Sequence, residues 1–65
     1  DERLGRQEAI RLGIPIIGIL GVLLVAKRRS LILQIKPVVD TLIHQAGFRV
    51  SPQLYQQVLV FAQEA

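Results

Sequence analysis

The chain contains no cysteine, and this absence excludes both disulfide bonds and thiolate metal sites. A chain of 65 residues therefore depends on its apolar core, which is small at this length. Hydrophobic residues nevertheless make up 51% of the composition, and charged residues only 20%. So small an interior cannot bury this much apolar surface, and we expect a second copy, further sequence or a lipid bilayer to cover the excess.

Methionine is also absent, and the chain begins at Asp1. Because initiator methionine is normally removed only before small residues, we expect the sequence to be a piece of a longer chain. The charged start does not resemble a secretory signal peptide, since the apolar run lies inside the chain. We therefore predict a cytoplasmic protein.

Residues suited to catalysis are few and scattered. Among the five carboxylates, Glu8, Asp40 and Glu64 are expected to be solvated surface charges, and Asp1 is expected to cap a helix. His44 is the only histidine, and its position predicts a half-buried residue on a helix. No serine lies beside a base, so nucleophilic catalysis has no support. The residues taken alone do not predict an active site.

Prolines and glycines divide the chain into about four helices and one short strand, a mainly α architecture. The first helix covers roughly the first dozen residues and ends at Gly13, a residue suited to the left-handed position there. A strand over 14–17 follows, because Pro15 disfavours helix at the residue before it. Gly18 and Gly21 are expected to flank the turn that leads out of this strand.

The remaining helices have clearer boundaries. The second is predicted over 20–29, and the third begins around Pro37 and stops at Gly47. The fourth has Ser51 as its N-cap and a proline as its first residue. The link between the second and third helices carries four aliphatic residues that we expect to pack inward: Leu31, Ile32, Leu33 and Ile35.

The apolar run over 12–26 also has a membrane interpretation. It is about fifteen residues long, which is short of the roughly twenty that span a bilayer. The basic triplet at 27–29 has the character of a cytoplasmic anchor. The two later helices have amphipathic stripes that favour a shared globular core, so we prefer the core and keep membrane attachment as an alternative.

Basic residues give the chain a net charge of +3, which mildly favours polyanions such as RNA. A solvated helix end is the alternative explanation for the basic triplet, because cations complement the helix dipole there. The aromatic residues are few and show no interleaving with the basic ones that would predict base stacking. The candidate phosphate contacts are Arg3, Arg6, Lys27, Arg28 and Arg29.

An ordered series of short motifs resembles the C-terminal half of a PIN-like protein. Each motif is weak alone, but their order along the whole chain is fairly specific. The closest resemblance is to small prokaryotic proteins described as predicted nucleic-acid-binding proteins that contain a PIN domain. The motifs are Asp1-Glu2-Arg3, Leu12-Gly13-Ile14-Pro15, Gly18-Ile19-Leu20-Gly21, Ala26-Lys27-Arg28, Ile35-Lys36-Pro37, Ala46-Gly47-Phe48-Arg49-Val50-Ser51 and Leu54-Tyr55.

The resemblance implies that the chain is the C-terminal part of an α/β sandwich with a parallel sheet. It also implies descent from ribonucleases that use Mg2+ or Mn2+, often as toxins of toxin–antitoxin pairs. Asp1 would then match a catalytic, metal-binding carboxylate, with Glu2 as a lesser candidate. The other carboxylates of the family have no counterpart here, and Ile19 stands where the family has a turn hydroxyl. The chain as given is therefore expected not to cleave RNA.

Residues 1–65 are thus predicted to be a single small domain or fragment of a PIN-like nucleic-acid-binding protein, with no cofactor of its own. The expected partners are RNA, an antitoxin-like protein, and either a missing N-terminal half or a second copy. Two alternatives belong to other classes of protein. One is a stand-alone helical interaction module that forms a homodimer, and the other is a membrane-associated peptide.

Overall fold

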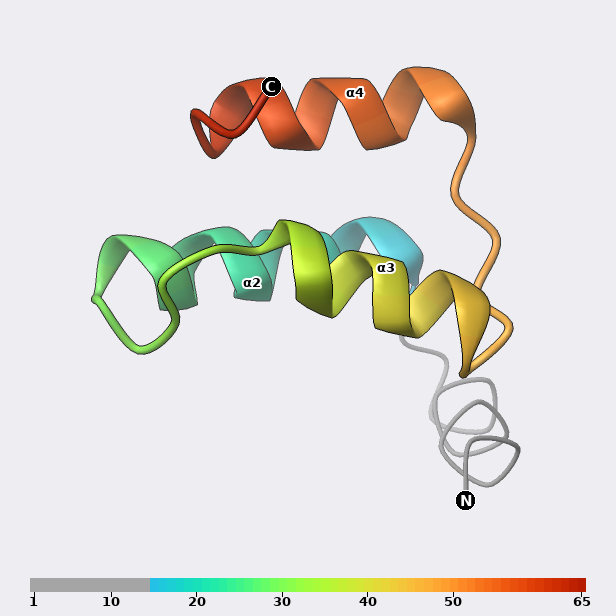
Figure 1. Ribbon diagram of the computed structural model, residues 1–65, viewed down its shortest axis with the longest axis horizontal. Coiled ribbons are helices and arrows are strands. Elements are labelled where there is room, and N and C mark those ends of the chain that lie inside the picture. The colour runs from blue at the N-terminus through green and yellow to red at the C-terminus, as the bar shows by residue number, and fades with distance from the viewer. Residues whose placement is uncertain (1–14) are drawn as a thin grey trace.

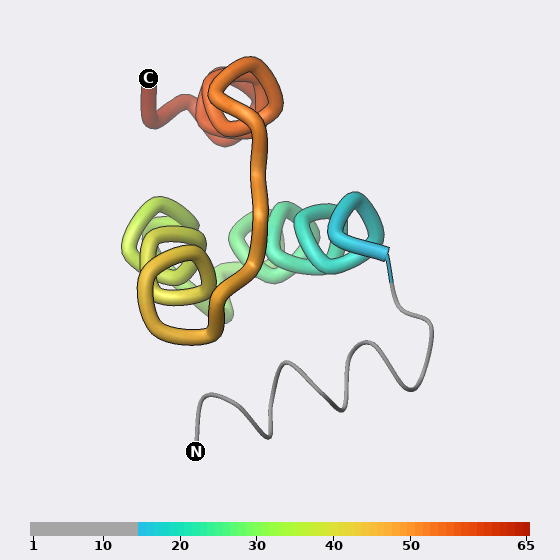
Figure 2. Tube along the Cα trace, turned by 90° about the vertical axis from the view of Figure 1, so that its right-hand side faces the viewer, coloured from blue at the N-terminus to red at the C-terminus, as the bar shows by residue number. Residues whose placement is uncertain are grey.

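The computed structural model describes residues 15–65, and these residues form three helices. Helix α2 spans Ile16–Arg28, α3 spans Lys36–His44 and α4 spans Pro52–Phe61. Helices α2 and α3 lie side by side, and α4 lies on one side of this pair, above them in both views (Figure 1 and Figure 2). The helix expected in the first dozen residues falls outside the described range. The mainly helical character is confirmed.

Helix α2 begins at Ile16, and the strand predicted over 14–17 is therefore wrong at Ile16 and Ile17. Pro15 is the N-cap, with φ −72° and ψ 152°, and its carbonyl accepts the N–H of Gly18 at 3.1 Å. A strand needs a partner for its backbone groups, and none lies within residues 15–65. A helix pairs the same groups internally. Gly18 and Gly21 consequently lie inside α2 and flank no turn.

The boundaries of α3 and α4 confirm the signals in the sequence. Pro37 lies in the first turn of α3, and Gly47 follows that helix with a φ of 73°, a left-handed conformation natural to glycine. Ser51 is the N-cap of α4, and its Oγ accepts the N–H of Leu54 at 3.1 Å. Residues close in sequence therefore mark the start of α4 and lie near both ends of α3.

The core lies where the three helices meet. Ile35 and Val39 at the start of α3 are fully buried, so they form the centre of the packing. In the link before α3, Ile32 is half-buried, but Leu31 and Leu33 are 74% and 90% exposed. The prediction that all four aliphatic residues of the link pack inward is thus wrong for these two leucines. The buried residues are Leu20, Ile35, Val39, Val58, Leu59 and Ala62.

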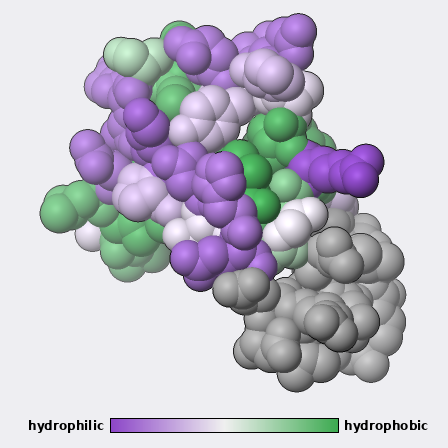
Figure 3. All heavy atoms as spheres, turned by 45° about the vertical axis from the view of Figure 1, so that its right-hand side comes forward, coloured by the Kyte–Doolittle hydropathy of each residue, from purple (hydrophilic) through white to green (hydrophobic). Residues whose placement is uncertain are grey.

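Apolar side chains also reach the surface of the described part. Figure 3 shows hydrophobic groups among hydrophilic ones on one face of the molecule. On α2, Ile17 and Val22 are 62% and 68% exposed, and on α4 Phe61 is 79% exposed. The excess of apolar residues expected from the composition is therefore present as exposed surface.

Candidate nucleic-acid interface

The basic triplet lies at the end of α2, where the chain reverses. Ser30 adopts a φ of 62°, and its N–H donates to the carbonyl of Lys27 at 2.9 Å. The next N–H, from Leu31, donates to the carbonyl of Ala26 at 2.9 Å. These two bonds form a Schellman motif, which satisfies the last carbonyls of the helix. The motif ends α2 directly after Arg28 and turns the chain toward the link that follows.

The three cations of the triplet have different surroundings. Lys27 is half-buried, and its Nζ donates to the carboxylate of Glu64 at 2.9 Å and also to the carbonyl of Ala62. Arg28 and Arg29 are exposed, and neither forms an ion pair with any residue in the range 15–65. Lys27 therefore links α2 to the end of α4, whereas the side chains of the two arginines are exposed to solvent.

Glu64 is the partner of Lys27 in this ion pair and has a second role. Its Oε2 accepts the N–H of Ile35 at 2.8 Å, and its Oε1 accepts the N–H of Lys36 at 2.9 Å. These are N–H groups at the start of α3, which have no partner inside the helix. The following residue, Pro37, has no N–H to satisfy. One carboxylate from near the C-terminus thus caps α3 and complements the positive end of its dipole.

The surroundings of Glu64 act on its pKa in opposite directions. Burial raises the pKa, because removal from water disfavours the charged form. The hydrogen bonds from Ile35, Lys27 and Lys36, together with the charge of Lys27, lower it by more, so the net pKa lies below the ordinary value. The side chain is only 5% exposed. The prediction of a solvated surface charge at Glu64 is therefore wrong.

A second polar contact joins α3 to α4. The hydroxyl of Tyr55 donates to Oδ1 of Asp40 at 2.6 Å. This hydrogen bond, partial burial and the carboxylate charge all raise the pKa of Tyr55. Asp40 is half-buried and accepts this hydrogen bond, so it is not the solvated surface charge that was predicted. His44, by contrast, is exposed rather than half-buried as predicted.

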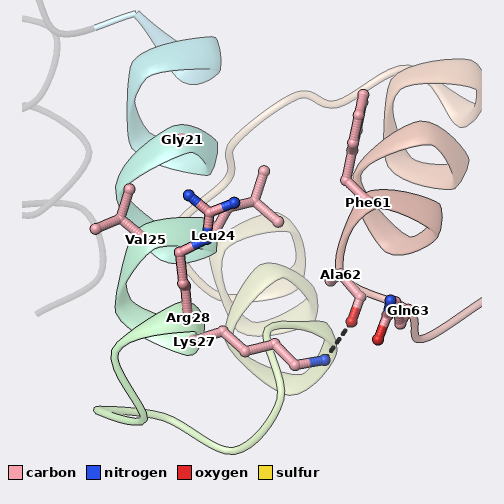
Figure 4. Close-up of a pocket in the computed structure, with 8 residues that line it drawn as sticks. All are labelled: Gly21, Leu24, Val25, Lys27, Arg28, Phe61, Ala62 and Gln63. Carbon is pink, nitrogen blue, oxygen red and sulfur yellow. Dashed lines mark hydrogen bonds between the residues drawn. The ribbon is translucent and has the colours of Figure 1, made fainter.

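A hollow of about 480 Å³ lies beside the basic end of α2. One wall comes from α2, with Leu24, Val25 and Arg28, and the other comes from the end of α4, with Phe61 (Figure 4). Gly21 also lines it, and a Cβ there would meet no atom within 4 Å, so the glycine leaves this part of the hollow open. The hollow thus combines an apolar interior with a cation at its edge.

The predicted catalytic and metal-binding residues, Asp1 and Glu2, lie outside the described range, as do Arg3 and Arg6. Within 15–65, no group of three or more histidine, aspartate or glutamate residues is placed to hold a metal ion. The two carboxylates of this range are already engaged, Asp40 by Tyr55 and Glu64 by α3 and Lys27. These residues do not fit Mg2+ or Mn2+, so no catalytic step is assigned to them.

The structure also brings together residues that the sequence keeps apart. Phe61 lines the same hollow as Arg28, although more than half of the described chain separates them. No interleaved pattern of aromatic and basic residues exists in the sequence to predict this neighbourhood. Only the packing of α4 against α2 creates it.

A family model for the PIN domain matches residues 1–64. The chain belongs to the PIN-domain family. No curated protein and no solved structure matches the chain significantly. The resemblance found in the motifs is thereby confirmed over nearly the whole length of this PIN-domain chain. As for the membrane alternative, none of the three described helices is long and apolar enough to cross a bilayer.

Proposed function

We propose that this PIN-domain chain is the C-terminal part of a nucleic-acid-binding protein and binds RNA without cleaving it. Membership of the family over residues 1–64 carries the proposal. The exposed Arg28 and Arg29 at the end of α2 support it, because they are free of ion pairs with any described residue. Exposed arginines of this kind bind phosphate oxygens and release counterions.

The charge balance of the described residues also supports the proposal. Among residues 15–65 there are five lysines and arginines and only two carboxylates, both held in internal contacts. Of the candidate contacts, Lys27 is tied to Glu64 and contributes mainly to the fold. We therefore assign phosphate binding to Arg28 and Arg29, with Arg3 and Arg6 as further contacts.

Binding of a fluorescently labelled single-stranded RNA, followed by anisotropy at several salt concentrations, tests the proposal. The variant Arg28→Gln/Arg29→Gln is expected to weaken binding and to reduce the salt slope by roughly 0.7 for each phosphate that the protein no longer neutralises. The matched control, Lys36→Gln/Arg49→Gln, removes the same charge from exposed positions elsewhere. Equal losses of affinity in both variants, or no binding by the parent chain, would contradict the assignment.

Catalysis is expected to be absent in this chain. The proposal gives Asp1 and Glu2 a role at a Mg2+ or Mn2+ site only in a complete PIN domain that supplies the other carboxylates. Incubation of RNA with the chain and either ion should leave the RNA intact. Cleavage that depends on the metal and disappears in Asp1→Ala would overturn this part of the proposal.

Self-association is a second candidate function, favoured by the aliphatic surface of α2. Ile17 and Val22 both lie on this helix, and both are more than half exposed. A second copy or further sequence would cover them. Sedimentation equilibrium tests this directly, since Val22→Glu should convert an associated species to a monomer, whereas Gln53→Glu on α4 should not.

A further inference from the structure

We infer that the hollow between α2 and α4 holds one base of a single-stranded nucleic acid, stacked on Phe61 with its phosphate on Arg28. This inference rests on the proposed RNA binding and adds to it the place and the mode of recognition. The observation behind it is the neighbourhood of an exposed aromatic ring, an open apolar hollow and an arginine without an ion pair among residues 15–65.

The volume of the hollow is sufficient for a base. This volume of about 480 Å³ lies within the range of about 300–1,000 Å³ that is usual for small-molecule sites. Leu24 projects from α2 toward the end of α4, and Phe61 lies opposite it on α4 (Figure 4). A flat base between an aliphatic wall and an aromatic ring buries both of its faces. Stacking of this kind accepts any base, because every base has a π face.

The charged side chains around the hollow favour an anionic ligand. Lys27 borders the hollow, but Glu64 neutralises it. Arg28 borders the hollow as well and has no carboxylate partner within the described range. The local charge that faces a ligand is therefore positive and comes from a guanidinium, which binds phosphate oxygens in a bidentate manner. An apolar peptide segment would leave this charge uncompensated. An acidic peptide segment would neutralise it but would lack a flat surface for Phe61.

A second concave surface lies along α4 and shares Phe61 with the hollow. Phe61 also borders a wider concavity whose other lining residues include Gln53, Gln56 and Gln57. Their amides both donate and accept hydrogen bonds, as the edges of bases do. A strand with one base in the hollow would therefore place its neighbouring nucleotide against this row of amides.

The experiment uses the variant Phe61→Trp, because the chain contains no tryptophan of its own. Its fluorescence is measured while an oligoadenylate of about ten nucleotides is added, a length suited to one small single-strand site. The matched ligand is an abasic strand with the same sugar-phosphate backbone. We expect quenching by the oligoadenylate and none by the abasic strand, because only stacked bases quench the indole.

Affinity provides an independent test with variants that keep the fold. Phe61→Leu retains an apolar side chain at a position that is 79% exposed, and we expect it to weaken binding of oligoadenylate about tenfold. Leu33→Ala changes another exposed apolar residue that does not line the hollow, and we expect no change in affinity.

The possible results separate this inference from the proposed function. Unchanged affinity in Phe61→Leu, or equal quenching by the abasic strand, would overturn the stacking site while RNA binding itself stood. A tryptophan signal that depends on protein concentration without RNA would show that a second copy occupies the hollow, and would overturn it too. Absence of RNA binding by the parent chain would instead refute the proposed function.

Discussion

Removal of the Glu64 carboxylate should destabilise the fold more than any other single change at a charged residue in the described range. Glu64→Ala leaves two N–H groups at the start of α3 and the ammonium of Lys27 without their acceptor. Loss of an N-cap alone costs about 1 kcal/mol, and loss of a charged hydrogen bond costs a similar amount or more. We therefore expect a loss of about 2 kcal/mol in the free energy of unfolding.

That loss is large for so small a core, which rarely supplies more than about 3–5 kcal/mol. Urea unfolding followed by circular dichroism measures it. With a slope of about 1 kcal/mol per molar, the midpoint should fall by about 2 M. Lys36→Gln is the matched control, because it changes one charge at the same end of α3 but keeps the backbone N–H that Glu64 accepts. A midpoint in Glu64→Ala within about 0.5 M of the parent would refute the capping role.

The pH dependence of the same comparison identifies the ionised carboxylate as the cause. Since the pKa of Glu64 is lower in the folded chain than its ordinary value of 4.5, the stabilisation is fully present above pH 4.5 and is lost as the pH falls through the folded pKa. The parent chain and Glu64→Gln should therefore differ most near neutral pH and converge in acid. A difference between them that does not shrink with falling pH would show that shape, and not charge, accounts for the effect.

Three further predictions concern the helix ends and the contact between α3 and α4. Ser30→Gly should raise the free energy of unfolding by about 0.5–1 kcal/mol in urea, because glycine adopts a φ of 62° without strain. Ser51→Ala should lower it by about 1 kcal/mol through loss of the bond to Leu54, and Ser51→Asn, which keeps a capping oxygen, should restore most of that loss. The absorbance of Tyr55, the only tyrosine, should titrate above its ordinary pKa in the parent chain and at a lower pH in Asp40→Asn.

The parts of the fold that could be predicted from sequence are those determined by a few adjacent residues. Ser51 before a proline marks the start of α4, and Gly47 marks the end of α3, and both act within one helical turn. The strand over 14–17 could not be judged in this way, because a strand depends on a partner elsewhere. With none among residues 15–65, Ile16 and Ile17 join α2.

The candidate site depended even more on distant contacts. Glu64 resembles any polar residue near a helix end, and its role appears only when Ile35 is brought to it from 29 positions away. Nothing in the sequence connects Phe61 with Arg28, yet Phe61 is exposed and lines the same hollow. The membership of the family, by contrast, was predictable, because the order of the short motifs can be read from the sequence without knowledge of how the helices pack.

The two side chains of the ion pair between Lys27 and Glu64 cannot be exchanged without loss of hydrogen bonds, whereas those of an ordinary surface ion pair can. If the two side chains were exchanged, an ammonium group at position 64 would face the N–H donors of Ile35 and Lys36 at the positive end of α3. A glutamate at position 27 would in turn meet the carbonyl of Ala62, which is an acceptor as well. The swapped pair would thus carry the same net charge and yet bring donors against donors and acceptors against acceptors. A charge swap at these two positions is therefore not equivalent to the native pair, because the direction of α3 requires an acceptor at position 64.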